Sequence, residues 1–282
     1  MQLDFAGVLP LADGRYLARD EAGESVLVMK TLGAPAPARR HRRRPRDTGS
    51  VVEPASLPLT RITAIRAYAP SAHEEEVAAW LEETLADEEA TDAAVAEGVA
   101  LLNRALHAQA VAAADPIGGE LAPEQAVAVR LGYGSGDQVA AGGFATAQEV
   151  DVRATGFSRR RQREEDLQPQ ERMAAVLRGS ERLDACEPLL LRARADLDAG
   201  REREAALQLR GGLEALLAEL VGAVSDPGHG EDMAMLRERR GEAGEAANEA
   251  LRGELSGATT TSVTELLERC ERVLRRRRVL RG

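Results

Sequence analysis

In the first third of the chain, apolar residues occur in short runs separated by turn residues, a pattern typical of β-strands. Residues 3–32 contain three such runs. Asp13-Gly14 is the dipeptide preferred in two-residue hairpin loops, and residues 21–24 mark a second turn. The last run, residues 25–32, has the continuous apolar sequence of a buried strand. The pattern predicts a three-stranded β-meander over residues 1–32.

Residues 59–156 mix strand and helix periods. Strand-like sequence occupies residues 60–68 and returns at residues 125–133, where Val127, Val129, Leu131 and Tyr133 alternate on one predicted face. Between these strands, Ser71 and Glu74 form a capping box that predicts the start of a helix. A second helix is expected to end before Asp115. A further strand is expected at residues 148–153.

From residue 157 onward the apolar positions recur three and four apart, as on one face of a helix. Pro169 is placed as a first-turn proline, Gly179 ends that helix, and Gly200 separates two antiparallel helices. The pair Gly211-Gly212 inside the second of these helices costs about 2 kcal/mol relative to alanine. Close helix packing or a kink would explain that cost.

The last two predicted elements follow a loop at residues 225–231. An alanine-rich helix runs to Gly253, and a final helix begins at Ser262. Its apolar stripe continues to Leu274, and the next stripe position is Arg277. The C-terminal part is therefore expected to be a helical bundle with one charged end.

Together these patterns predict an α+β fold. Its parts are a β-meander at 1–32, a disordered Pro/Arg-rich linker at 33–58, a mixed region with an acidic helical hairpin at 59–156, and a helical bundle at 157–282.

Charge is distributed unevenly along the 282 residues. The whole chain carries a net charge of −10, whereas residues 71–150 alone hold 15 acidic and 2 basic residues. Arginines cluster at 39–46, 159–163 and 275–281. The last cluster ends a helix, where the macrodipole favours positive charge, and the second can pair with the carboxylates that follow it.

The first arginine cluster has no such local explanation. Six arginines within eight residues repel one another and have no apolar partner to bury. They form the candidate site for contact with an anionic or protein partner: Arg39, Arg40, Arg42, Arg43, Arg44 and Arg46. They could also bind the acidic hairpin at residues 74–97 as an internal clasp.

Motifs for enzymes, metals and cofactors are weak. The glycine-rich segment 132–143 fails as a dinucleotide fingerprint, since Asp137 or Val139 stands where the third glycine is needed. His229 lies among carboxylates, but the predicted loop around it is expected to be solvated and lacks a recognised ligand spacing. The two cysteines lie far apart, so they do not predict a metal site. No metal ligand set and no cofactor are predicted.

Cysteine usage and the absence of a signal peptide or an apolar membrane span predict a soluble cytoplasmic protein that does not enter a membrane. The function expected from these features is a non-enzymatic interaction protein with a protein partner. One alternative is an accessory protein that binds nucleic acid nonspecifically through its arginines. Another is an enzyme of unrecognised type, with a site near residues 132–143 or around His229. The sequence leaves the oligomeric state open.

Overall fold

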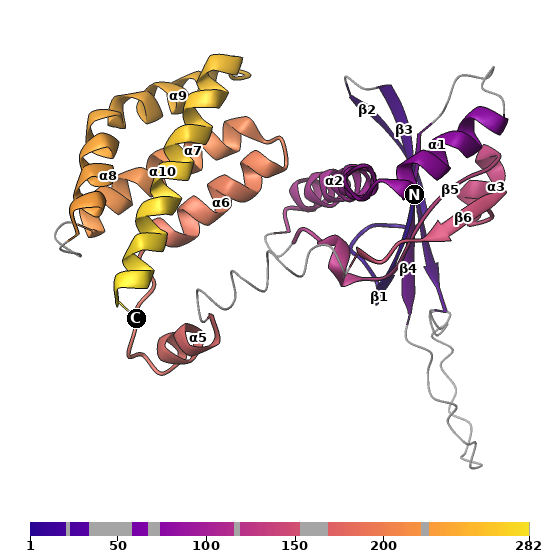
Figure 1. Cartoon of the computed structure of the whole chain (residues 1–282), viewed down its shortest axis with the longest axis horizontal. Coiled ribbons are helices and arrows are strands. Elements are labelled where there is room, and N and C mark those ends of the chain that lie inside the picture. Colours follow the sequence, from indigo (N-terminus) through magenta and orange to yellow (C-terminus); the bar gives the residue numbers. More distant parts are fainter. Residues whose placement is uncertain are drawn as a thin grey trace, which may run out of the picture. The chain divides into compact units, whose positions relative to one another are not determined.

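The structure is a computed structural model that describes residues 1–20, 23–33, 58–66, 74–115, 119–152, 169–220 and 226–281. The chain divides into two compact units, Met1–Ser158 and Arg159–Gly282 (Figure 1). The first contains an antiparallel sheet and the second a set of helices, so the α+β fold is confirmed. Apart from Gly33 and Pro58, the predicted linker at 33–58 lies outside the described residues.

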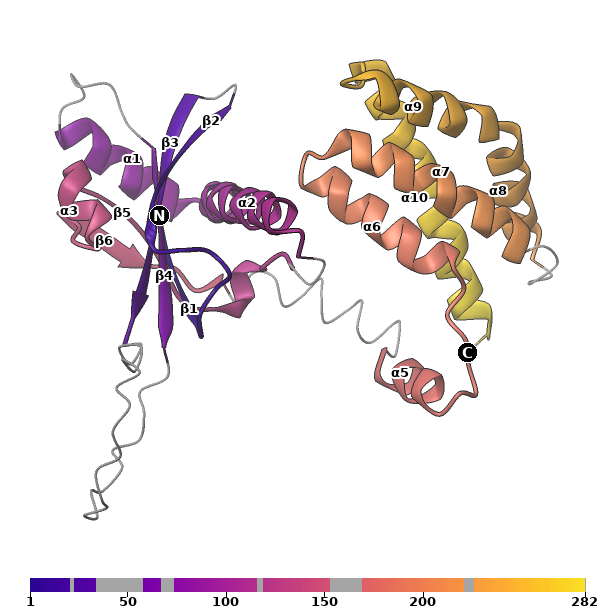
Figure 2. The same cartoon turned by 180° about the vertical axis from the view of Figure 1, so that it is seen from behind.

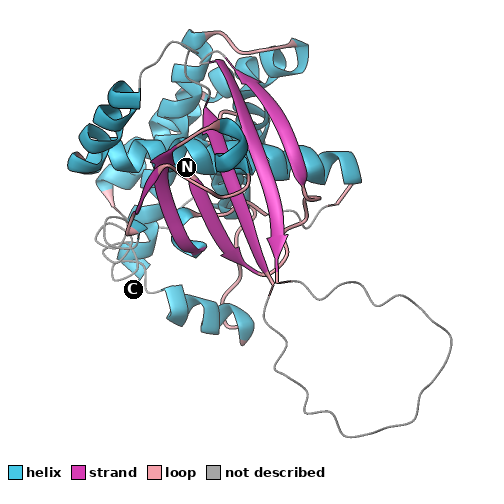
Figure 3. Ribbon diagram, turned by 90° about the vertical axis from the view of Figure 1, so that its right-hand side faces the viewer, coloured by secondary structure: helices cyan, strands magenta, loops and turns pink. Residues whose placement is uncertain are grey.

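The first unit is built on one six-stranded sheet in the order β2-β3-β4-β1-β5-β6, with every neighbouring pair antiparallel (Figure 3). Its strands are β1 (Gln2–Ala6), β2 (Gly14–Asp20), β3 (Gly23–Leu32), β4 (Leu59–Arg66), β5 (Ala126–Tyr133) and β6 (Thr146–Glu149). Strands from the two regions predicted at 1–32 and 59–156 therefore belong to the same sheet.

The pairing predicted for the first strand was wrong. Strand β1 lies between β4 and β5 and does not pair with β2, so only β2 and β3 form a hairpin within residues 1–32. The carboxylate of Asp13 instead accepts hydrogen bonds from the backbone N–H (2.9 Å) and hydroxyl (2.8 Å) of Thr31. Because Leu3 and Phe5 on β1 are buried, this strand needs a central place in the sheet, which a local hairpin at the sheet edge would not provide.

In the described part of this unit, four helical segments accompany the sheet: α1 (Glu74–Ala86), α2 (Glu88–Ala113), the short 3-10 helix η1 (Pro123–Gln125) and α3 (Gly136–Ala140). The two predicted helices of the acidic hairpin are present, although Ser71 lies outside the described residues. Asp87 caps α2 by accepting a hydrogen bond from the N–H of Glu89 at 2.9 Å. Helix α2 packs Val95, Val99 and other apolar residues into the core that the sheet provides.

Strand β5 contains a β-bulge that the alternating pattern did not reveal. Phe5 pairs with Ala126 and Asp4 with Ala128, so Val127 has no partner on β1. As a result Val127 is 56% exposed, although it was predicted on the same face as the buried Val129. Strand β6 also begins two residues earlier than predicted and spans Thr146–Glu149.

The second unit contains α5 (Pro169–Leu177), α6 (Cys186–Asp198), α7 (Glu202–Glu219), α8 (Pro227–Glu238), α9 (Arg240–Arg252) and α10 (Gly257–Arg281) (Figure 2). Pro169 begins α5 as predicted, and Gly179 and Gly200 take positive φ angles of 74° and 71° at their turns.

Close packing explains the second glycine of α7. A Cβ atom added at Gly212 would lie 2.8 Å from Cγ of Leu190 on α6, so a side chain there would push the two helices apart. Gly211 has only an ordinary contact, 3.8 Å from Cδ1 of Leu189. Both glycines lie within one continuous helix.

Two predicted helix boundaries were wrong. Within the loop expected at 225–231, helix α8 already begins at Pro227, because Asp226 caps it and accepts a hydrogen bond from the N–H of His229 at 2.8 Å. The alanine-rich segment that follows is divided between α8 and α9. Helix α10 begins at Gly257, and Ser262 lies inside it with its hydroxyl donating to Glu242 at 2.7 Å. Ser256 accepts the N–H of Thr259 at 3.3 Å instead.

Candidate functional site

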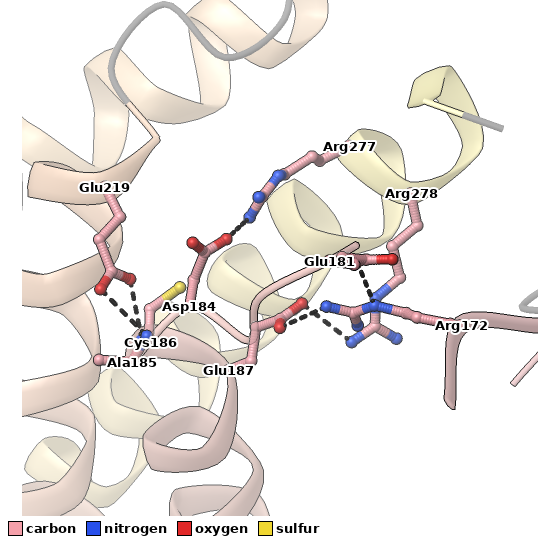
Figure 4. Close-up of polar contacts among 9 residues, drawn as sticks. All are labelled: Arg172, Glu181, Asp184, Ala185, Cys186, Glu187, Glu219, Arg277 and Arg278. Atoms are coloured by element: carbon pink, nitrogen blue, oxygen red, sulfur yellow. Dashed lines mark hydrogen bonds and ion pairs between the residues drawn. The ribbon is translucent and has the colours of Figure 1, made fainter. Parts of the chain in front are cut away.

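Charged side chains converge where the last described turns of α10 meet the starts of α6 and α8 and the end of α7. We call this group the polar end of the helical unit. It consists of Arg172, Glu181, Asp184, Cys186, Glu187, Glu219, Asp226, His229, Asp232, Arg269, Arg272, Arg276, Arg277 and Arg278. Figure 4 shows the part of it that surrounds α6.

Arg277 occupies the next position of the apolar stripe of α10, and its side chain is buried. Its guanidinium forms an ion pair with Asp184, which immediately precedes α6 (Figure 4). A buried arginine needs such a partner because an unpaired charge in the interior is strongly unfavourable. The pair thus joins the end of α10 to the start of α6.

Glu187 forms ion pairs with two further arginines. Arg172 on α5 donates from Nη2 to Glu187 Oε2 at 2.6 Å and from Nε to Glu181 at 2.7 Å. Arg278 on α10 reaches the other oxygen of Glu187 at 3.4 Å. Burial tends to raise the pKa of Glu187, but the hydrogen bonds and charges of the two arginines outweigh it and hold that pKa below 4.5.

Glu219 at the end of α7 caps the start of α6. Its two carboxylate oxygens accept the N–H groups of Ala185 and Cys186, each at 3.0 Å, where α6 has no side-chain cap of its own (Figure 4). Burial, followed by the carboxylate of Glu219, raises the pKa of Cys186 to about 12. The thiol is therefore protonated at neutral pH and is a poor nucleophile.

The other part of the polar end centres on Asp232 of α8. This buried carboxylate lies 2.7 Å from Nη1 of Arg269 and 3.4 Å from Nη1 of Arg276, both on α10. Arg276 also lies 3.5 Å from Asp226. Its guanidinium occupies the space that a side chain at Gly228 would need, so the glycine permits this close approach.

His229 lies among these groups and is 3% exposed, so the prediction of a solvated loop was wrong. Neither Nδ1 nor Nε2 has a hydrogen-bond partner among the described residues. Burial, and then the charge of Arg276, lower the pKa of His229 below 6.5. The imidazole is therefore neutral at pH 7.

The first unit contains a second buried charge network, between three strands of the sheet. Asp4 on β1 accepts from Nε of Arg61 at 2.8 Å and from Nη2 at 2.9 Å, and Arg130 on β5 donates to it at 3.0 Å. A Cβ atom at Gly142 would lie 3.0 Å from Nη1 of Arg61, so the glycine-rich segment packs directly beside this network. The network holds strands together and contains no histidine or cysteine.

Of the three predicted arginine clusters, the structure describes part of the last one. Arg39, Arg40, Arg42, Arg43, Arg44 and Arg46, and the cluster at 159–163, lie outside the described residues, and so does one side of the proposed clasp. In the third cluster, Arg276, Arg277 and Arg278 all face carboxylates of their own unit.

Sequence reasoning missed the carboxylates that receive these arginines, chiefly Asp184, Glu187 and Asp232. The sequence did carry a signal for one of them. Asp226-Pro227 is a helix start of the N-cap and first-turn-proline type, and it would have placed His229 and Asp232 on one helix.

The described ranges contain no group of three or more His, Cys, Asp or Glu side chains that could hold a metal ion. A search of the helices in the same ranges for a bilayer-spanning candidate gave none. Comparisons of the chain with models of known protein families, with curated proteins and with solved structures gave no match.

Proposed function

We propose that this protein is a non-enzymatic interaction protein whose helical unit presents α5 to a protein partner. The observation that carries the proposal is the apolar side of α5. None of its nine residues is buried, and Met173 and Leu177, four positions apart on one helical face, are 58% and 78% exposed. Leu183, in the connection to α6, is exposed as well.

Helix α5 is held in place by charge. A helix of nine residues is too short to be stable alone in water. Arg172 ties it to Glu181 and, across to α6, to Glu187. The adjacent Met173 and the nearby Leu177 remain uncovered, which is the i, i+4 anchor arrangement of helices that bind in an apolar groove.

We favour a groove on a different protein over a second copy of this chain. Contact between two copies through α5 alone would bury little more than Met173 and Leu177 from each, far less than the about 800 Å² per partner of a standard interface. A groove encloses a helix from several sides and so buries more area for each residue of α5.

The polar end supports an interaction role over catalysis or nucleic-acid binding. Its arginines are paired within the unit, which lowers their availability to a phosphate backbone. The thiol of Cys186 is held protonated beside a carboxylate that already caps a helix. Contact between Arg39–Arg46 and an anionic partner stays a prediction, which the nuclease step below separates from binding through α5.

The test is retention of proteins from native lysate by the full-length chain, with and without nuclease. The wild type is compared with the double variant Met173→Ala/Leu177→Ala and with Leu251→Ala, which removes an equally exposed leucine from α9. We expect the same protein to be retained by the wild type and by Leu251→Ala after nuclease treatment. Loss of two apolar anchors should weaken that retention by at least about tenfold.

Three results would overturn the proposal: no specifically retained protein, equal retention by the double variant, or retention that disappears with nuclease. The last result would favour nucleic-acid binding. Circular dichroism of each variant establishes that the helices are intact.

A further inference from the structure

The starting observation is that the His229 side chain is buried at the first turn of α8 with no partner for either ring nitrogen among the described residues. Buried polar atoms in proteins are nearly always paired with protein or ordered water. A neutral imidazole tolerates this position far better than an imidazolium, which would bring an additional buried charge and two donors that both require acceptors.

Among the described residues, the charged groups that act most strongly on His229 come from α8 and α10. Asp226 and Asp232 belong to the start of α8, and Arg276 and Arg277 belong to α10. Both carboxylates are already engaged, since Arg276 lies 3.5 Å from Asp226 and 3.4 Å from Asp232. Asp232 also receives Arg269 at 2.7 Å.

A proton on His229 would therefore compete with Arg276 for the same two carboxylates. The positive end of the α8 macrodipole adds to the cost, because His229 lies in the first turn of that helix. Arg276 is packed over Gly228, directly beside His229 in the sequence, so the two cations would be forced close together.

We propose that His229 is a proton-sensitive latch between α8 and α10: its neutral form permits the contact of Arg276 with Asp226 and Asp232, and its protonation opens that contact. The inference does not depend on the partner proposed for α5.

The direction of the effect follows from linkage. The pKa of His229 in the closed form lies below the ordinary value of 6.5, so the open form takes up a proton more readily. The closed contact is fully stable above pH 6.5 and loses stability as the pH falls below it.

Two measurements on the full-length protein test the latch. The imidazole signal of His229, assigned by its loss in His229→Gln, should titrate below pH 6.5 in the NMR spectrum. Hydrogen exchange of the α8 amides, corrected for the intrinsic pH dependence, should rise between pH 7.5 and 5. The expected rise is about tenfold for each unit by which the pKa of His229 lies below its free value.

The variants make the test specific. His229→Gln removes the titrating group, so the acid-induced rise in α8 exchange should vanish even if exchange is faster at every pH. His107→Gln, on an exposed position of α2, should leave the rise unchanged. A His229 pKa at or above 6.5, or the same rise in α8 exchange in His229→Gln, would overturn the proposal.

Discussion

The two units each bury a network of charges, and the networks differ in how completely they are satisfied. Asp4, Arg61 and Arg130 come from neighbouring strands whose register places them side by side, and Gln2 and Thr63 complete the hydrogen bonding. The polar end draws its members from several helices. Two of its buried contacts are ion pairs without hydrogen-bond geometry, Arg277 with Asp184 and Arg276 with Asp232. Among the described residues, both ring nitrogens of His229 and Nε of Arg278 have no hydrogen-bond partner.

This difference separates a structural network from one that can respond to conditions. In the described residues of the sheet unit, no buried side-chain polar atom lacks a hydrogen-bond partner. Binding of a proton or a ligand would therefore satisfy no missing hydrogen bond there. In the polar end, the two ring nitrogens of the neutral His229 have no hydrogen-bond partner among the described residues. Functional change is therefore expected at the helical unit, with the sheet unit as its stable neighbour in the chain.

The largest expected effect comes from removing the centre of the sheet network. Asp4→Ala leaves Arg61 and Arg130 as neighbouring like charges without their shared carboxylate. We expect a loss near the lower end of the about 3–5 kcal/mol typical of a broken buried pair, because both arginines partly reach solvent. Denaturant unfolding followed by Trp80 fluorescence, which reports on the sheet unit, measures it.

The matched control is Glu149→Ala, since Glu149 is an exposed partner of Arg130 at 3.7 Å. It should cost less than about 1 kcal/mol. A similar small cost for Asp4→Ala would show that the network does not stabilise the sheet.

An intermediate effect tests whether close packing of α7 against α6 stabilises the helical unit. Gly212→Ala forces a methyl group against Leu190 and should cost about 1–3 kcal/mol through overpacking. Gly211→Ala has room for the methyl group and should instead stabilise by up to about 1 kcal/mol through helix propensity. Thermal unfolding followed by far-UV circular dichroism measures both, and equal signs would contradict the packing argument.

The smallest expected effect is a difference in acid sensitivity between the units. The pKa of His229 is lowered from 6.5, so its contribution to stability is complete above that pH and declines below it. For Asp4, burial alone would raise the pKa, but the bonds to Arg61 and Arg130 hold it below 3.8, so its contribution is lost only in stronger acid. As the pH is lowered from 7 to 5, amide hydrogen exchange should become faster in α8 before it becomes faster in β1. If exchange increased in both at the same pH, the two units would not differ in acid sensitivity.

Local sequence signals were sufficient where a structure depends on neighbours in the chain. Pro169, Gly179 and Gly200 mark helix boundaries because the φ angles that proline and glycine favour are local properties of those residues. The stripe of α10 was also recognisable, including Arg277 at its end.

Long-range pairing was not accessible in this way. The central position of β1 and the bulge at Val127 depend on partner strands 53 or more residues away in the sequence. The burial of His229 depends on α10, whose Arg276 packs over Gly228. The sequence around His229 is rich in glycine and carboxylates and favoured a solvated loop. His229 is buried because α10 packs against this segment, which local composition does not reveal.

The arginines of α10 also carry a consequence for biosynthesis. Helix α10 supplies the partners of Asp184 and Asp232 and one wall of the apolar core, yet it is synthesised after every other described helix of its unit. The nascent helical unit must therefore hold uncompensated carboxylates and open apolar faces until its last helix leaves the ribosome. The strands of the sheet are complete by residue 149, so the first unit can close while the second is still being made.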